Sequence, residues 1–149
     1  MFKKSAKRFF TKAQKTEIIH AIMNAEHDTS GEIKVHIENN CDEDVLDRSA
    51  YWFEKLKMHK TELRNGVLFY LAIRSKKFAI LGDVGINQAV PEDFWDEVKE
   101  LMSEKFEEGK FSEGLAEGIQ KAGCLLKKHF PRHSDDINEL SDEISFGKN

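Results

Sequence analysis

Three residues with oxygen-bearing side chains stand next to the strands expected in the middle of this chain. Glu32 precedes the first strand, Asn65 precedes the second, and Asp83 follows the third. A helix between the first two strands would make them parallel, and the third would return antiparallel, so all three residues reach one end of the sheet. Carboxylate and amide oxygens are the ligands that calcium and magnesium prefer. The sequence therefore predicts a calcium or magnesium site formed by Glu32, Asn65 and Asp83, with Arg64 close by.

A purely structural role for the same residues stays open, because Asn and Asp often serve turn geometry and a glutamate can end a strand in solvent. No complete catalytic set accompanies them. Cys41 and Arg48 miss the spacing of cysteine phosphatases by one residue, and the carboxylates between them would repel a phosphate dianion. The acidic stretch 42–44 lacks the apolar strand end that precedes the nucleophile of aspartyl-phosphate enzymes. Catalytic residues therefore stay unassigned.

Hydrophobic periodicity predicts the elements that must position these side chains. Apolar residues recur at helical spacing in four stretches, and they alternate or run without interruption in three shorter ones. The expected helices span 11–27, 43–56, 91–106 and 111–126, and the expected strands span 33–37, 67–73 and 78–81.

Local signals refine these elements. Thr11 and Gln14 have the spacing of a capping box, and Asp42 is the expected cap of the second helix. The alternation in 33–37 predicts a strand covered on one face, whereas the uninterrupted run 67–73 predicts one covered on both. The two glycines at 114 and 118 lie on one flank of the last helix, where we expect another backbone to approach closely.

The expected fold is α/β, a three-layer helix–sheet–helix sandwich around a small mixed β-sheet with one long hairpin. A basic N-terminal segment, 1–10, precedes the domain at 11–130, and an acidic flexible tail, 131–149, follows it. The tail carries several carboxylates and few apolar residues, a composition that favours disorder.

Composition and charge limit the function classes. The net charge of −4 over 149 residues argues against a globally basic nucleic-acid binder, so we expect no nucleic-acid partner. Two cysteines far apart in the sequence do not form a disulfide framework. No apolar run reaches the length of a membrane span, and we expect a cytoplasmic protein. The basic start, with Phe2, Phe9 and Phe10, predicts at most a weak contact with a membrane surface.

Three sequence stretches together resemble the TPM domain family. They are Arg64-Asn65-Gly66-Val67-Leu68, Gly82-Asp83-Val84-Gly85, and the stretch 106–115, which reads Phe-Glu-Glu-Gly-Lys-Phe-Ser-Glu-Gly-Leu. The similarity extends over about 11–129 and is that of a soluble bacterial-type member without signal peptide or membrane anchor. Asp83 departs from the Gly-aromatic-Gly turn of the family and adds a carboxylate.

The resemblance implies a helix–sheet–helix sandwich, an association with divalent cations such as calcium, and the acid-phosphatase activity and photosystem repair role reported for thylakoid-lumen members. Three functions are therefore expected, in this order. The first is a calcium- or magnesium-binding accessory or interaction domain with an unknown protein partner. The second is a metal-dependent acid phosphatase of phosphomonoesters, in which Arg64 would offset developing charge. The third is a non-catalytic protein-interaction scaffold.

Overall fold

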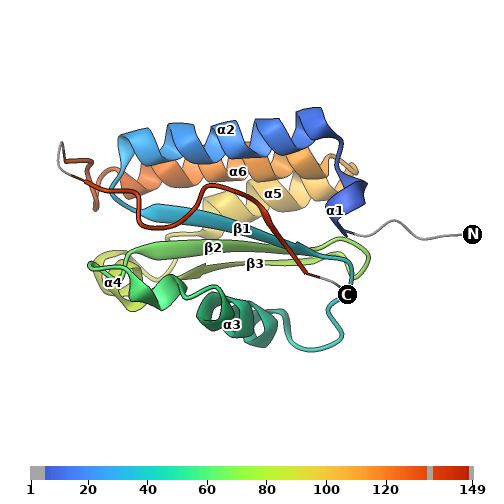
Figure 1. The fold of residues 1–149 in the computed structure, drawn as a ribbon, viewed down its shortest axis with the longest axis horizontal. Helices are drawn as coiled ribbons and strands as arrows, with labels where there is room; N and C mark the ends of the chain where they lie inside the picture. Colours follow the sequence, from blue (N-terminus) through green and yellow to red (C-terminus); the bar gives the residue numbers. More distant parts are fainter. Residues whose placement is uncertain (1–5, 134–135, 148–149) are drawn as a thin grey trace, which may run out of the picture.

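The computed structural model describes residues 6–133 and 136–147, and this part of the chain forms a four-stranded sheet between helices (Figure 1). The sheet order is β3-β2-β1-β4. Figure 1 shows α2, α5 and α6 on one face and α3 on the other, so the predicted three-layer α/β sandwich is confirmed. The elements are α1 (Ala6–Phe9), α2 (Lys12–Asp28), β1 (Glu32–Glu38), α3 (Val45–Lys55), the 3-10 helix η1 (Met58–Lys60), β2 (Gly66–Ala72), β3 (Lys77–Gly82), α4 (Val84–Ala89), α5 (Asp96–Glu107), α6 (Phe111–Leu126) and β4 (Ser145–Phe146).

The three long strands have the predicted directions. β1 and β2 are parallel, with Glu32 opposite Gly66, and α3 forms the crossover between them. β2 and β3 form the predicted antiparallel hairpin, in which Val67 pairs with Gly82. This register brings the first residue of β1, the first of β2 and the last of β3 to the same end of the sheet.

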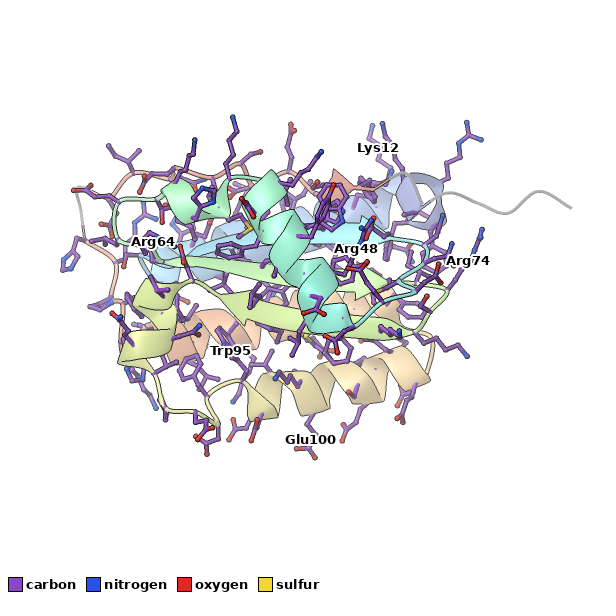
Figure 2. The ribbon with its side chains drawn as sticks, turned by 90° about the horizontal axis from the view of Figure 1, so that it is seen from below. Lys12, Arg48, Arg64, Arg74, Trp95 and Glu100 are labelled. Carbon is purple, nitrogen blue, oxygen red and sulfur yellow. The ribbon has the colours of Figure 1, made fainter. Side chains whose placement is uncertain are left out.

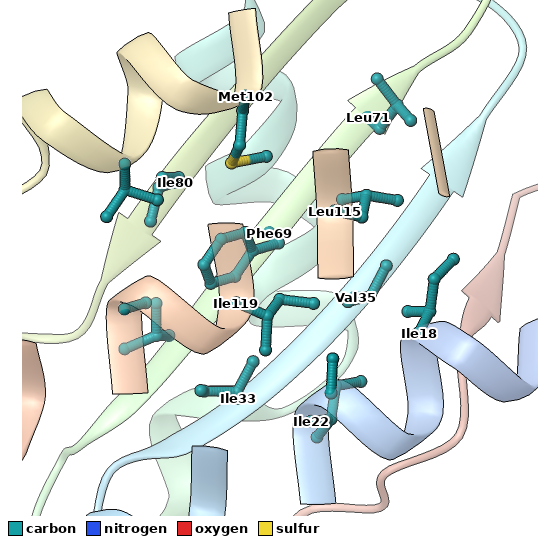
Figure 3. Packing of buried hydrophobic residues seen from close by; sticks show 14 of the residues in the cluster. Ile18, Ile22, Ile33, Val35, Phe69, Leu71, Ile80, Met102, Leu115 and Ile119 are labelled. Carbon is teal, nitrogen blue, oxygen red and sulfur yellow. The ribbon is translucent and has the colours of Figure 1, made fainter. Parts of the chain in front are cut away.

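The main core lies between the sheet and the layer of α2, α5 and α6 (Figure 3). Alternate residues of β1 and β2 face it, among them Ile33, Val35 and Phe69. A smaller cluster under α3 contains Phe53, Met58, Leu68 and Tyr70. β2 is buried along its whole length, as predicted.

The expectation that β1 is covered on one face only is wrong. Its polar residues His36 and Glu38 are 0% and 1% exposed. The alternation of apolar and polar residues in β1 predicted solvent on the second face, but α3 and the C-terminal segment cover it. Glu38 is tolerated there because Arg48 forms an ion pair with it and Tyr70 donates a hydrogen bond to it.

Helix ends follow the sequence signals in part. The capping box of α2 is present, since Thr11 Oγ1 accepts from Gln14 N and Gln14 Oε1 accepts from Thr11 N. Asp44, rather than Asp42, caps α3, because its carboxylate accepts hydrogen bonds from Leu46 N and Asp47 N. α5 begins at Asp96 and not at Pro91, because the intervening residues form tight turns that bury Phe94 and Trp95.

Small residues of α6 allow close packing, but another backbone approaches at Gly123 and not at the predicted Gly114 and Gly118, where side chains lie. A Cβ on Gly118 would lie 2.6 Å from Met102 Cγ of α5, and one on Gly123 would lie 2.7 Å from Ala25 Cβ of α2. α6 therefore packs tightly against both neighbouring helices, and larger side chains at these positions would force them apart.

The C-terminal segment is not a flexible tail over residues 136–147. Ser145 and Phe146 form β4, which pairs in parallel with β1, and Gly147 N donates to Ile37 O at 3.0 Å. The prediction from acidic composition overlooked three apolar residues of this segment, which pack against the two cores: Leu140, Ile144 and Phe146. The domain therefore extends past the predicted boundary at residue 130, while 134–135 and 148–149 lie outside the described residues.

The N-terminal boundary also moves. Residues 6–9 form α1, and Ala6 and Phe10 are buried in the main core. This part of the basic segment belongs to the fold, whereas residues 1–5 lie outside the described residues. No helix in the described residues is both long and apolar enough to span a membrane.

Candidate metal centre

Backbone geometry places Glu32, Asn65 and Asp83 at one end of the sheet. Glu32 N donates to Asn65 O at 3.0 Å, and Asp83 N donates to Gly66 O at 2.9 Å. All three residues are buried, with 3–5% of their surface exposed. The topological argument from sequence therefore leads to a real juxtaposition of three buried polar residues.

The side chain of Asp83 turns away from the other two. Its carboxylate forms a bidentate pair with Arg64, with Nε to Oδ2 and Nη2 to Oδ1 both at 2.8 Å, and it also caps α4 by accepting from Val84 N at 2.7 Å. Both oxygens are thus engaged. Asp83 and Arg64 line a cavity of about 330 Å³ beside α3, and Figure 2 shows Arg64 on this side of the sheet.

Glu32 and Asn65 line a different cavity, of about 300 Å³, between the start of the sheet and the C-terminal segment. Its other lining residues are Ser30, Glu62, Leu63, Asp136, Ile137 and Glu139. The structure therefore brings two of the three expected ligands together and adds carboxylates that the sequence interpretation missed. The acidic residues of the tail were the available signal, but nothing in the sequence indicated where that segment would pack.

The segment 136–140 is held to this end of the sheet by two backbone contacts. Leu140 N donates to Glu32 Oε1 at 2.6 Å, and Glu62 N donates to Glu139 Oε2 at 3.2 Å. Each contact joins a carboxylate of the cavity to the backbone of the opposite segment. The carboxylates are consequently positioned by residues far apart in sequence.

Asn65 has an oxygen without a partner. Its Nδ2 donates to Ser30 O at 2.6 Å, and since a carbonyl only accepts, this contact fixes which amide atom is nitrogen. The remaining atom, Oδ1, is buried and has no hydrogen-bond partner among the described residues. A buried acceptor left unpaired costs roughly 1–3 kcal/mol. This oxygen is therefore a place where a bound cation would restore a missing interaction.

The carboxyl groups near this end of the sheet hold protons tightly. Burial raises the pKa of Glu32 to about 7, and the nearby Glu139 carboxylate adds to the rise, while the N–H groups of Leu140 and Glu139 oppose it. Burial also raises the pKa of Glu26 to about 9, with Asp142 adding to the rise and Ile33 N opposing it. Negative charge here is short of compensation, which favours a bound proton or a bound cation.

The donor set suits a hard cation, because it consists of carboxylate and amide oxygens. Within the described ranges, however, no group of three or more His, Cys, Asp or Glu side chains is arranged to hold a metal ion. A cation at Asn65 Oδ1 would therefore need rotation of the flanking carboxylates, or water molecules as further ligands. Water ligands are ordinary for magnesium, which keeps several waters in protein sites.

A second polar cluster lies under α3, and its groups satisfy one another. Glu38 accepts from Arg48 Nε and Nη2 at 2.9 and 2.8 Å and from Tyr70 Oη at 2.6 Å. Burial would raise the pKa of Glu38, but these hydrogen bonds outweigh it and hold the pKa below its usual value. The guanidinium of Arg48 is thus paired with Glu38, and the thiol of Cys41 donates to Glu43 O. These paired groups stabilise the packing of α3 on the sheet.

Comparisons with known proteins agree with this architecture. The sequence profile of the TPM domain matches residues 4–124. The solution structure of the BA42 protein from the psychrophilic bacterium Bizionia argentinensis is 47% identical in sequence, covers 93% of this chain and 96% of its own, and has a TM-score of 0.89.

More distant structures share the fold alone. The N-terminal domain of a protein from P. gingivalis is 19% identical, with a TM-score of 0.67 over 83% of this chain and 82% of that one. The N-terminal domain of the cg2496 protein from Corynebacterium glutamicum is 12% identical, with a TM-score of 0.63 over 95% of this chain and 82% of that one. A search of curated proteins gave no match.

Proposed function

Because this chain belongs to the TPM domain family, we propose that it is a divalent-cation-binding accessory domain that takes calcium or magnesium between the sheet and its C-terminal segment. The observation that carries the proposal is the buried, unpartnered Oδ1 of Asn65, a residue that lines a cavity together with several carboxylates. The proposed ligands are Asn65, Glu32 and Glu139, with Glu62 and Asp136 at the same cavity.

The first step of the argument is chemical. Asn65 Oδ1 is removed from water without a hydrogen bond to compensate, because no donor among the described residues reaches it. A cation coordinated there removes that cost, and carboxylates complete the hard oxygen set that calcium and magnesium require. The nitrogen and sulfur ligands that select zinc or copper do not line this cavity.

The second step is electrostatic. Glu32 and Glu139 line the same cavity. Because the pKa of Glu32 is about 7, a large fraction of the molecules carries a proton on this side chain at neutral pH. A divalent cation displaces that proton, because both compete for the same carboxylate. Binding is therefore expected to strengthen as the pH rises through 7.

The third step assigns a different role to Asp83. Its two oxygens already bind Arg64 and the N-terminus of α4, so we do not propose it as a ligand. The same pair holds Arg64, whose guanidinium would otherwise be available to a phosphoryl group. This arrangement favours cation binding over phosphomonoester hydrolysis as the function of this end of the sheet.

The consequence of binding is mechanical. The proposed ligands come from β1, from the turn before β2, and from the segment that leads to β4. A cation that joins them would fasten the C-terminal segment to the sheet. The domain would then present its β4 side in a cation-dependent form to an interaction partner.

The test is a titration of the full chain with calcium and with magnesium, followed by amide chemical shifts. We expect the shifts to concentrate in residues 30–32, 62–65 and 136–140. Glu139→Gln should weaken the affinity by about ten-fold or more, since even the loss of a group that only orients a ligand typically costs that much. Glu143→Gln is the matched control, since it is an exposed glutamate of the same segment that lines a different groove.

Two results would overturn the proposal. One is a Glu139→Gln variant that titrates like the wild type. The other is a set of shifts confined to residues 42–47, the acidic start of α3. Turnover of a chromogenic phosphate ester that needs the cation would instead restore the phosphatase hypothesis.

A further inference from the structure

Positive charge is concentrated at the start of the chain. The first fifteen residues contain six Lys or Arg and no Asp or Glu, although the whole chain has a net charge of −4. In the described part, Lys7, Arg8 and Lys12 are exposed and Lys15 is partly exposed. α1 and the first turn of α2 therefore form a basic surface on a protein that is acidic overall.

An aromatic ring is exposed within this basic surface. Phe9 is 38% exposed and packs edge to face on Phe10 at 5.0 Å and on Phe111 at 5.6 Å between ring centroids. The contact with Phe111 joins α1 to α6, and part of the Phe9 ring is left in solvent. The exposed apolar ring is thus a fixed feature of the fold.

A groove of about 520 Å³ runs beside these cations. Ile19, Ile144 and Phe146 supply its apolar lining, and Lys7, Lys15 and Glu143 supply its charged lining. Lys15 Nζ lies 5.3 Å from the centroid of the Phe146 ring. The groove therefore combines aliphatic and aromatic surface with two ammonium groups and a single carboxylate.

We propose that this basic surface and its groove bind the anionic face of a lipid bilayer. Lys7, Arg8, Lys12 and Lys15 match lipid phosphates, while Phe9 and the groove offer apolar contact at the depth where headgroups meet acyl chains. Nucleic acid is the less suitable partner, because two isoleucines line the groove, whereas single strands are bound by stacking on exposed aromatic faces.

The distribution of charge along the molecule orients it on such a surface. The carboxylate-lined cavity with Glu32 and Glu139 lies at the beginning of β1, whereas α1 lies toward the end of that strand (Figure 1). Lys12 and Arg64 also lie toward different ends of the molecule in Figure 2. An anionic surface would attract the basic α1 end and repel the carboxylates of this cavity, which favours an approach through α1.

The test uses the full chain and vesicles of phosphatidylcholine with 30% phosphatidylglycerol, with pure phosphatidylcholine vesicles for comparison. EDTA is present throughout, so that the result is independent of the cation site. We expect flotation with the anionic vesicles only, and its loss in 1 M salt, where the screening length falls to about 3 Å.

A triple variant, Lys7→Glu, Arg8→Glu and Lys12→Glu, should reduce partitioning at least ten-fold, because each basic residue contributes up to about five-fold. The control variant carries the same charge change at exposed lysines elsewhere: Lys99→Glu, Lys127→Glu and Lys128→Glu. Thermal melting checks that both variants fold. The control should retain at least a third of wild-type binding.

A spin-labelled headgroup lipid locates the contact without any mutation. We expect it to broaden the amide signals of residues 7–15 and 144–146 and to leave those of 127 and 128 sharp. The proposal fails if the anionic vesicles do not bind at low salt, if both triple variants lose binding equally, or if the protein binds single-stranded DNA and not vesicles.

Discussion

Glu32 and Leu140 are 108 residues apart in the sequence, yet Leu140 N donates a 2.6 Å hydrogen bond to Oε1 of Glu32. The contact joins the first residue of β1 to the segment that leads into β4. It gives a buried carboxylate one of its few donors and places Glu139 beside it. The candidate cation site and the docking of the C-terminal segment are therefore one structural feature.

Removal of residues 134–149 should lower the stability of the domain. Leu140, Ile144 and Phe146 are partly buried, and full burial of such a side chain contributes about 1.5–3 kcal/mol, so we expect a loss on the order of 2 kcal/mol or more. Thermal melting in EDTA measures it, at about 2–4 °C per kcal/mol for a domain of this size. An unchanged melting temperature would mean that the segment does not dock in solution.

Two alanine substitutions in α6 should differ in cost. A Cβ on Gly123 meets the Cα of Ala25 at 2.9 Å, which only a backbone shift can relieve, whereas one on Gly118 meets the side chain of Met102. We expect Gly123→Ala to cost about 1–3 kcal/mol by overpacking. Gly118→Ala should cost less, since Met102 can change rotamer and alanine gains about 1 kcal/mol in helix propensity.

Urea unfolding of both variants checks this order. Gly118→Leu extends the series, and we expect it to cost at least as much as Gly123→Ala, because its side chain exceeds the space that Met102 can vacate. Equal stability of the two alanine variants would contradict the packing described for α2 and α6.

Stability should fall as the pH rises from 7 to 9. Glu26 has a pKa of about 9 in the fold against 4.5 normally, so the folded state holds an additional proton between these values. The stabilisation is complete below pH 4.5 and is lost as the pH rises through 9, by up to about 1.4 kcal/mol per pH unit. Burial lowers the pKa of His36 to about 4. This shift makes the stability rise with pH up to about 6.5, so it does not affect the interval from pH 7 to 9.

The measurement is urea unfolding at several pH values for wild type, Glu26→Gln and Glu17→Gln. Glu26→Gln should flatten the dependence between pH 7 and 9. Glu17→Gln, an exposed position of the same helix, should leave it unchanged. A wild type whose stability does not fall over this interval would show that Glu26 is ionised in the fold.

Asp83→Ala should destabilise the domain without affecting calcium binding. The variant loses the cap of α4 and the ion pair with Arg64, and loss of an N-cap alone costs about 0.5–2 kcal/mol. Asp83→Asn retains a capping side chain and should lose less. If Asp83→Ala instead abolishes the calcium-induced shifts, the ligand set predicted from sequence, with Asp83 included, is correct.

The sequence by itself determined the long helices and strands and their order. Periodicity located α2, α3, α6 and the three long strands. Burial of one face of an element places its apolar residues at a regular spacing, and this spacing can be read directly from the sequence. The crossover rule then brought Glu32, Asn65 and Asp83 to one end of the sheet. These inferences succeed because they depend on local pattern and on chain direction alone.

Tertiary structure decided which side chains face each other. The backbone positions of Asn65 and Asp83 follow from strand register, but Arg64 draws the Asp83 carboxylate into another cavity. The charge of the C-terminal segment led to the prediction of a flexible tail. Composition counts the carboxylates of the segment but does not show the protein surface on which the segment packs. Its few apolar residues suffice once β1 offers a free edge, and only the folded sheet creates that edge.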